Sequence, residues 1–307
     1  MRVIFLGTGG FARPALSRLA ERHDVVLVVT QPDRPAGRHA EPSAPPVKDE
    51  AESLALSLFQ PERINTPESV SRLRSADADI LVVAAYGQLL KPEVFNAAPR
   101  GAVNIHASLL PAYRGAAPIQ WAIRRGGSQS GVTTFQLDQG MDTGPLLLQR
   151  RLDIGPDETA GELERRMAVL GADLSLETLE GLETGSIVPE PQSEQGVSLA
   201  PRLTKDDGRV DWTTTAAEVH NLVRGTTPWP GAWTFLSGER IKLLRTARTG
   251  VAAGRLEPGL VGPREARQLL IACADQLLEI VEVQREGRPR TTGREFLNGM
   301  RAGARFE

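Results

Sequence analysis

Short apolar runs alternate with amphipathic helical patterns through the first half of the chain. Apolar runs of strand length cover residues 2–7, 24–30, 78–87 and 101–107. Patterns of helical period lie between and after them, at residues 13–22, 47–56, 67–76 and 117–126, with one more short strand expected near Leu58. Because strands that alternate with helices form parallel sheets, this order predicts a doubly wound, Rossmann-like α/β domain with a parallel sheet.

Two further strand patterns and one long helix complete this first domain. Residues 130–138 and 145–154 have the composition of strands. From Thr159 to Thr184, large apolar residues recur at helical spacing, at Leu163, Met167, Leu170, Leu174 and Leu179. This spacing predicts a long helix that closes the domain, so we expect a first, catalytic domain over residues 1–184.

The remainder of the chain predicts a linker and a second, β-rich domain. Residues 185–204 are rich in Pro, Ser and Gln without periodicity, which is typical of an extended linker. In residues 205–307, a short helical pattern at 215–225 precedes several short strand patterns separated by Gly and Pro turns. Such a series within about 90 residues predicts a small OB-like β-barrel.

The first strand leads into a glycine-rich turn. Gly7, Gly9 and Gly10 precede the helical pattern at 13–22 and approximate the dinucleotide fingerprint G-x-G-x-x-A. That fingerprint also requires an acidic residue at the end of the second strand, whereas Asp33 here follows only after a proline. A tight strand-to-helix turn is therefore favoured over nicotinamide binding.

A proline-rich segment, residues 31–46, interrupts the alternation after the second strand. It shows no periodicity and predicts a long surface loop. Loops of this length inside a compact domain are commonly functional or disordered.

Composition is that of an ordinary globular protein, but charge is unevenly distributed. Of 307 residues, 40% are hydrophobic and 24% are charged, and no apolar run approaches the roughly 20 residues that span a bilayer. We therefore expect a cytoplasmic protein with no membrane contact. Residues 201–307 hold 17 Lys and Arg against 13 Asp and Glu, a net charge of +4, and residues 1–200 hold 19 against 25, a net charge of −6. A basic second domain is a weak indication of a polyanionic partner.

The single cysteine, Cys273, excludes an intrachain disulfide and a metal cluster built from several cysteines. It lies within a strand-like run, so we expect a small buried apolar residue rather than a nucleophile.

Polar residues of catalytic type follow the apolar run at 78–87. Asn104 and His106 are one residue apart, so on a strand they face the same side, at the sheet edge where open α/β folds bind ligands. Alone, a histidine on a strand is more often structural. Asp142 lies in the pattern D-x-G-x-D-T-G, which begins at Asp138, and both carboxylates could instead be turn residues.

The residues that follow His106 favour a catalytic role over a structural one for these polar residues. The segment Ser108-Leu109-Leu110-Pro111, the pair Arg114-Gly115 and residues 117–121 follow His106 closely, and the D-x-G-x-D-T-G pattern follows them. Together these motifs resemble the formyltransferases that use 10-formyltetrahydrofolate, and the match extends over the whole length.

The resemblance implies a set of site residues. Transfer of a formyl group to an amine passes through a tetrahedral oxyanion, which the Asn104 amide and a protonated His106 would stabilise. Asp142 would favour the imidazolium form of His106 and accept or relay a proton. No metal is required. One wall of the folate pocket would comprise Ser108, Leu109, Leu110 and Pro111, with Val83, Tyr86 and Gly87 on the opposite wall and Asp138 beside Asp142.

The formyl acceptor is indicated by sequence outside this core, since relatives act on a glycinamide, a nucleotide amino-sugar or an aminoacyl-tRNA. Residues 30–38 resemble the loop that members acting on methionyl-tRNA insert into the acceptor stem, which implies tRNA contacts by Arg34 and Arg38. Residues 202–212, including Lys205, together with 223–234 and 293–300, resemble the C-terminal barrel of the same members. Here His39 and Ala40 follow Arg38 where those members carry lysines, which weakens the loop as an anion clamp.

We therefore expect a monomeric enzyme that formylates initiator methionyl-tRNA. The alternative enzyme is a nucleotide amino-sugar N-formyltransferase, which shares the core. The alternative without catalysis is a folate- or nucleotide-binding module, against which the intact Asn104, His106 and Asp142 argue.

Overall fold

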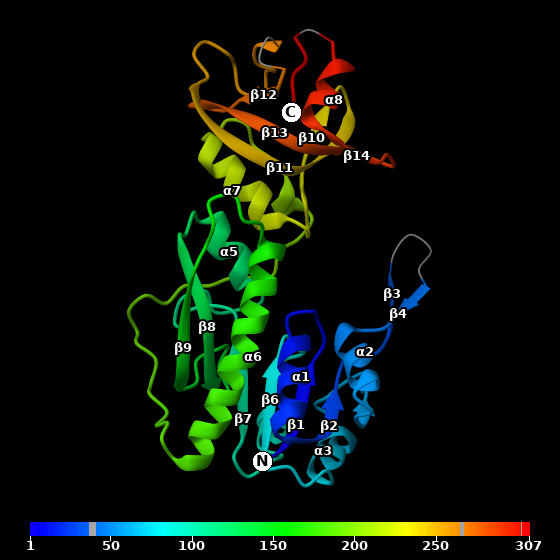
Figure 1. Cartoon of the computed structure of the whole chain (residues 1–307), viewed down its shortest axis with the longest axis vertical. Coiled ribbons are helices and arrows are strands. Elements are labelled where there is room, and N and C mark those ends of the chain that lie inside the picture. The colour runs from blue at the N-terminus through cyan, green and yellow to red at the C-terminus, as the bar shows by residue number, and fades with distance from the viewer. Residues whose placement is uncertain (37–40, 265–266, 302) are drawn as a thin grey trace. The chain divides into compact units, whose positions relative to one another are not determined.

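The computed structural model describes residues 1–36, 41–264, 267–301 and 303–307, and it divides into two compact units (Figure 1). The N-terminal unit comprises residues 1–115, 130–152 and 164–199, and the C-terminal unit comprises 116–129, 153–163 and 200–307. The domain boundaries at residues 184 and 205 stay a prediction. Among the described residues, no helix is long and apolar enough to cross a membrane.

The N-terminal unit is built on a seven-stranded sheet in the order β5-β2-β1-β6-β7-β8-β9. These strands are β1 (Arg2–Gly7), β2 (Asp24–Val29), β5 (Leu58–Phe59), β6 (Ile80–Ala84), β7 (Ala102–His106), β8 (Gln129–Gln136) and β9 (Leu146–Asp153). The first five strands in this order pair in parallel, whereas β7 and β8 pair antiparallel. The predicted doubly wound α/β fold with a parallel sheet is confirmed, and β8 is added antiparallel beside β7. To run parallel to β7, β8 would have to begin at the opposite end of the sheet, which requires a crossover connection. Instead, β8 begins at the same end of the sheet where β7 ends, so the two strands are antiparallel.

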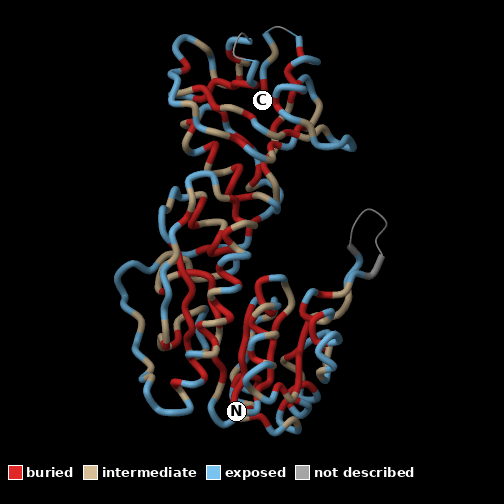
Figure 2. Tube along the Cα trace, in the orientation of Figure 1, coloured by how far each residue is buried: buried red, intermediate tan, exposed pale blue. Residues whose placement is uncertain are grey.

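Helices cover both faces of this sheet, as the doubly wound prediction requires. They are α1 (Arg13–Arg22), α2 (Pro46–Ser53), α3 (Pro67–Arg74), α4 (Pro92–Phe95) and α6 (Ala160–Thr184), of which α6 also contributes its start to the C-terminal unit. One face carries Leu81 and Val83 of β6, which pack with Leu73 of α3 and Phe95 of α4. On the other face, Gly171 of α6 approaches Ile105 of β7 so closely that an added Cβ would lie 2.9 Å from its Cγ2. The strands form the buried centre in Figure 2.

The glycine turn after β1 is a steric requirement. A Cβ on Gly7 would lie 2.8 Å from the Cβ of Ala12 and 2.7 Å from Phe5 Cε1. Contacts this short are not tolerated, so only glycine permits the strand to turn directly into α1.

The proline-rich segment contains more regular structure than its sequence predicts. Residues Arg34–Ala36 (β3) and Glu41–Ser43 (β4) form an antiparallel hairpin, in which Pro35 lies opposite Pro42. Proline is compatible with a two-stranded ribbon because each strand has one unpaired edge. The prediction of a loop without secondary structure was therefore wrong for the described part. Arg38 lies outside the described residues.

The C-terminal unit is an antiparallel sheet with helices. Its strands β10 (Ala232–Leu236), β11 (Glu239–Ala252), β13 (Gln276–Arg285) and β12 (Leu269–Ala272) are hydrogen-bonded in that order, and β14 (Arg290–Thr292) also pairs with β13. The remaining elements are α5 (Pro118–Arg124), the 3-10 turn η1 (Asp206–Gly208), α7 (Ala216–Thr226) and α8 (Gly293–Asn298). Val219, Ile241, Ile271 and Phe306 belong to its buried core, as does Cys273. The predicted second, β-rich domain is confirmed, and its OB-like closure stays a prediction.

Candidate active site

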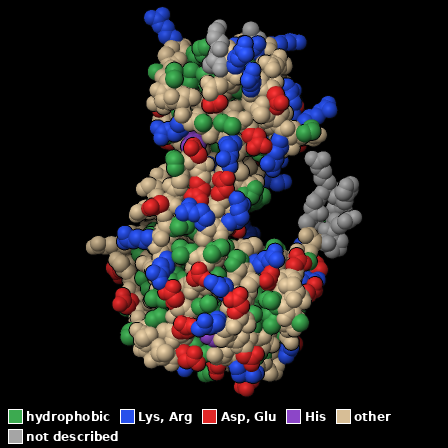
Figure 3. Space-filling view, viewed as in Figure 1, with side chains coloured by type: hydrophobic (Ala, Val, Ile, Leu, Met, Phe, Trp, Pro, Cys, Tyr) green, Lys and Arg blue, Asp and Glu red, His purple; other side chains and the backbone are tan. Residues whose placement is uncertain are grey.

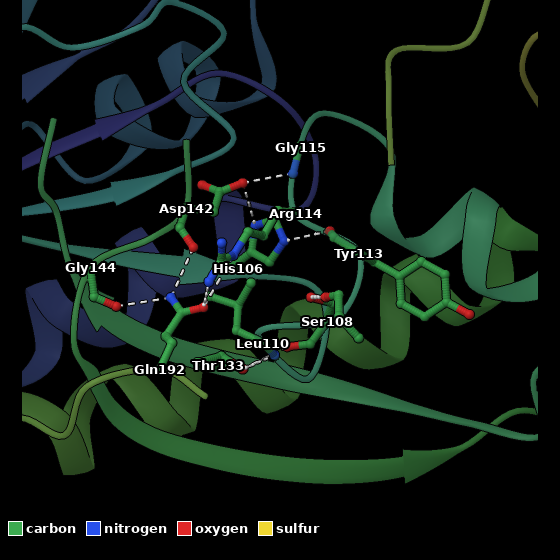
Figure 4. Close-up of polar contacts among 11 residues, drawn as sticks. His106, Ser108, Leu110, Tyr113, Arg114, Gly115, Thr133, Asp142, Gly144 and Gln192 are labelled. Carbon is green, nitrogen blue, oxygen red and sulfur yellow. Dashed lines mark hydrogen bonds and ion pairs between the residues drawn. The ribbon is translucent and has the colours of Figure 1, made fainter. Parts of the chain in front are cut away.

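His106 ends strand β7 with its ring buried between two protein oxygens (Figure 4). Nε2 lies 3.1 Å from the carbonyl oxygen of Tyr113, and Nδ1 lies 3.8 Å from Oδ2 of Asp142. Because a carbonyl only accepts, the first contact places a proton on Nε2. A second proton on Nδ1 would complete an ion pair with Asp142.

Asp142 is held by the loop that follows β7. Its Oδ2 accepts a hydrogen bond of 2.8 Å from the backbone N–H of Gly115. The backbone of Asp142 is left-handed, with φ of 55°, a conformation that Asp and Asn adopt more readily than most residues. Asp142 is therefore a turn residue whose carboxylate also lies beside His106, and its catalytic role stays a prediction.

Asn104 faces the same side of β7 as His106, as the period of a strand predicts. It lies beside Val83 of β6 and opposite Phe135 of β8, and His106 packs edge-on against the same Phe135 ring. Asn104 is half-buried. Within residues 1–36, 41–264, 267–301 and 303–307, no side-chain hydrogen bond to Asn104 is formed, so its amide is available to a ligand.

The segment after His106 is tied to strands β8 and β9. The Thr133 hydroxyl donates to the carbonyl of Ser108 (2.6 Å) and accepts from the N–H of Leu110 (3.2 Å). Gln149 Nε2 donates to the carbonyl of Leu110 (2.8 Å), and the Ser108 hydroxyl donates to the carbonyl of Ala112 (2.6 Å). Ser108 and Leu110 are thus buried anchors. The partly exposed members of the segment are Leu109 and Pro111.

The predicted opposite wall is the carboxyl end of β6 and the residues beyond it. Val83 and Tyr86 are buried in the core of the sheet face that carries α3 and α4. Burial raises the pKa of Tyr86, and its hydroxyl has no hydrogen-bond partner among the described residues. Gly87 follows in the left-handed region with φ of 92° and is exposed. Among these three residues, only Gly87 presents an exposed surface.

Asp138 organises the turn that carries Asp142. Its Oδ1 accepts from the backbone N–H of Gly140 (3.0 Å) and from the hydroxyl of Thr143 (2.7 Å). The first contact is that of an Asx turn, in which a side chain bonds the backbone two residues later. Folate contact by Asp138 stays a prediction.

Gln192 is a site residue that the sequence did not indicate. It lies in the segment predicted as a linker, yet its Nε2 donates to the carbonyls of Asp142 (2.8 Å) and Gly144 (2.9 Å). Its Oε1 accepts from Nη2 (2.6 Å) and Nε (3.2 Å) of Arg114 (Figure 4). No periodic pattern marks such a residue, because its partners lie far away in the chain.

The residues predicted to contact tRNA have simple surroundings. Arg34 and Glu62 are both exposed and form an ion pair of 2.7 Å. Lys205 is exposed, and its carbonyl accepts a hydrogen bond of 3.0 Å from Trp233 Nε1. Basic and acidic side chains are interspersed on the face of the N-terminal unit seen in Figure 3. In the part of the chain that the structure describes, no group of three or more His, Cys, Asp or Glu side chains is placed to hold a metal ion.

Comparison with known proteins matches both parts of the chain. A sequence model described as formyl transferase matches residues 1–179, and one described as formyl transferase, C-terminal domain, matches residues 202–301. Methionyl-tRNA formyltransferase of Solibacter usitatus is 49% identical over 98% of this chain and 96% of its own length, and that of Geobacter metallireducens is 43% identical with the same coverage. The structure of an N-formyltransferase from Helicobacter canadensis, solved in complex with folinic acid and dTDP-3-aminofucose, covers 92% of this chain and 98% of its own, with a TM-score of 0.71 and 18% identity.

Proposed function

The chain belongs to the formyl transferase family, and we propose that it transfers the formyl group of 10-formyltetrahydrofolate to the α-amino group of methionine on initiator tRNA. The relatives named methionyl-tRNA formyltransferase, which match nearly the whole length, support this acceptor. The sugar formyltransferase structures share the fold at 17% and 18% identity, which carries no argument for their acceptor. The observation that carries the catalytic part is the position of Asp142 beside Nδ1 of His106, with Asn104 on the same strand face.

The reaction forms one bond and breaks one. The methionine amine attacks the formyl carbon, and the tetrahedral intermediate bears a negative charge on the former carbonyl oxygen. The bond from that carbon to N10 of the folate then breaks. N10 gains a proton, the amine nitrogen loses one, and the products are formylmethionyl-tRNA and tetrahydrofolate.

Asn104 and His106 supply the donors for the oxyanion. A donor fixed in place before the reaction is worth about 3–4 kcal/mol to such a transition state. The Asn104 amide has an N–H available to the substrate. The Nε2–H of His106 points at the Tyr113 carbonyl, and we propose that the substrate oxygen replaces that carbonyl as its acceptor.

Asp142 is proposed to stabilise an imidazolium that forms at His106 during the reaction and to accept and return the proton. A carboxylate near an imidazole favours the imidazolium. The Gly115 N–H fixes the carboxylate without neutralising it. Asp142 then accepts the amine proton, directly or through water, and returns it to N10.

Folate binding is proposed for the walls beside this group. Ser108, Leu109, Leu110 and Pro111 form one wall, and Val83, Tyr86 and Gly87 form the other, with Asp138 shaping the turn below. Arg34, Arg38 and Lys205 are proposed to contact tRNA phosphates. Because charged initiator tRNA is used in the cytoplasm, we propose that the protein acts there. We also propose that it acts as a monomer.

The test is formylation of charged initiator tRNA, followed on acid gels with and without 10-formyltetrahydrofolate. Donor-dependent conversion is expected, together with no reaction on a nucleotide amino-sugar. The reverse result would assign the chain to the amino-sugar formyltransferases. For the tRNA contacts, Arg38→Ala should raise KM for charged tRNA much more than KM for the folate donor. Rising salt should weaken tRNA binding in the wild type, because phosphate contacts release counterions.

A further inference from the structure

The linker contacts both loops that surround His106. We name residues 190–199 the linker strap. Glu190 and Leu146, which follows the Asp142 turn, exchange two backbone hydrogen bonds of 2.7 and 2.9 Å. Farther along, the Ser198 hydroxyl accepts from the N–H of Tyr113 (2.9 Å), whose carbonyl in turn faces His106. The strap therefore joins the two loops that hold the partners of His106.

Between these anchors, Gln192 uses its whole hydrogen-bonding capacity. A side-chain amide has two donors and two acceptor positions. The donors reach the carbonyls of Asp142 and Gly144, and both acceptor positions receive N–H groups of Arg114. Reversal of the amide would set oxygen against two carbonyls and nitrogen against a guanidinium, so the partners fix its orientation.

Two crosslinks therefore join the same pair of loops. One is the side chain of Asp142 on the N–H of Gly115, and the other is Gln192, which binds Arg114 and the backbone of the Asp142 turn (Figure 4). The first holds only the side chain of Asp142. The second fixes the backbone from which that side chain extends.

We propose that Gln192 is a positioning residue for formyl transfer, which locks the Asp142 turn at the distance that His106 requires. The proposal rests on the function proposed above. It gives the linker a second role, since the strap continues at Ala200 into the C-terminal unit. The segment that joins the two units thus also positions the proposed catalytic carboxylate of Asp142.

Gln192→Glu tests this role with a change of one atom type. The carboxylate keeps an acceptor for Arg114 but opposes two carbonyl oxygens with a third oxygen. We expect kcat to fall by about 10- to 100-fold, the effect of displacing a catalytic group by about 1 Å. KM for the folate donor should stay within a few-fold. The matched control is Gln195→Glu in the same strap, whose exposed side chain should tolerate the same change of charge.

Two readouts separate positioning from general stability. In an Asp142→Asn background, Gln192→Glu should add little further loss, because Gln192 acts through that carboxylate. Amide hydrogen exchange at residues 113–115 and 142–144 should speed up in Gln192→Glu and not in Gln195→Glu. If Gln192→Glu lowers Tm by more than about 4 °C, the uncharged Gln192→Met replaces it in both experiments.

Each of these measurements either supports or contradicts the positioning role of Gln192. A loss of kcat that adds fully to that of Asp142→Asn, unchanged exchange in the two loops, or wild-type kcat in Gln192→Glu would each overturn the proposal. Hydrogen exchange needs no substrate, so it also decides the loop-locking step if the wild type fails to formylate tRNA. In that case the proposed function is wrong, while the proposal for Gln192 is still decided by hydrogen exchange.

Discussion

Asp142→Asn should remove catalysis while leaving the fold intact. Oδ2 of Asp142 lies 3.8 Å from Nδ1 of His106, and the two side chains are 17% and 7% exposed. At an effective dielectric constant of about 20, a full charge pair at this distance is worth about 4 kcal/mol. Asparagine replaces the charge by a dipole, so an imidazolium that forms at His106 in the transition state would lose most of this stabilisation. Each ~1.4 kcal/mol is tenfold in rate, and we expect kcat to fall by about 100- to 1000-fold.

The structure also predicts that this variant stays folded. The asparagine oxygen can accept the N–H of Gly115 as the carboxylate does, and asparagine tolerates the left-handed backbone at this position. Asp142→Ala loses that hydrogen bond and strains the backbone by about 1–2 kcal/mol. Tm should therefore be near the wild-type value for Asn and clearly lower for Ala.

The assay is single-turnover formylation of charged initiator tRNA at saturating donor, with Tm measured on the same samples. Asp142→Asn with a rate within a few-fold of wild type would refute the role of the charge. If Asp142→Asn melts as early as Asp142→Ala, the role of Asp142 is only structural, in the turn.

Three further outcomes can be checked independently. Asn104→Ala should lower kcat by about 100-fold with KM for the donor within a few-fold, measured by steady-state kinetics, because an oxyanion donor acts mainly in the transition state. Backbone and side-chain hydrogen bonds from Thr159 at the start of α6 lower the pKa of Glu162 to about 2. The ionised Glu162 therefore stabilises the folded state above its unfolded pKa near 4.5, and this contribution is lost as pH falls toward 2. Glu162→Gln should lower the free energy of unfolding by about 1 kcal/mol near neutral pH. The difference in Tm between variant and wild type should disappear in acid. Burial raises the pKa of the Cys273 thiol to about 12, so mass spectrometry should find no alkylation by iodoacetamide until the protein is unfolded.

The elements of the fold were predictable because they depend on local periodicity. Apolar runs marked β1, β2, β6 and β7, and helical spacing marked α6, since burial of one face imposes a period of two or of 3.6 residues. The direction of β8 was not predictable. Strand composition is the same for both directions, and the path of the connection decides between them.

The hairpin at β3 and β4 was missed for a related reason. Its prolines and lack of alternation are typical of a loop, and pairing over three residues leaves no period to detect. Arg34 was predicted to contact tRNA, which stays a prediction, and its ion pair with Glu62 could not be inferred from either residue alone.

By itself, the sequence placed Asn104 and His106 on one face of a strand, because two residues of a β-strand separated by one residue must share a side. It could not decide what His106 faces. The Tyr113 carbonyl and the Asp142 carboxylate lie against His106, and the amide of Gln192 binds the Asp142 turn, only because three loops distant in the chain come together at one end of the sheet. Local propensity does not encode the distances between such loops, since these distances follow from how the sheet packs and where the linker runs. The tertiary structure alone therefore decided that a residue of the linker holds the turn of the proposed catalytic carboxylate.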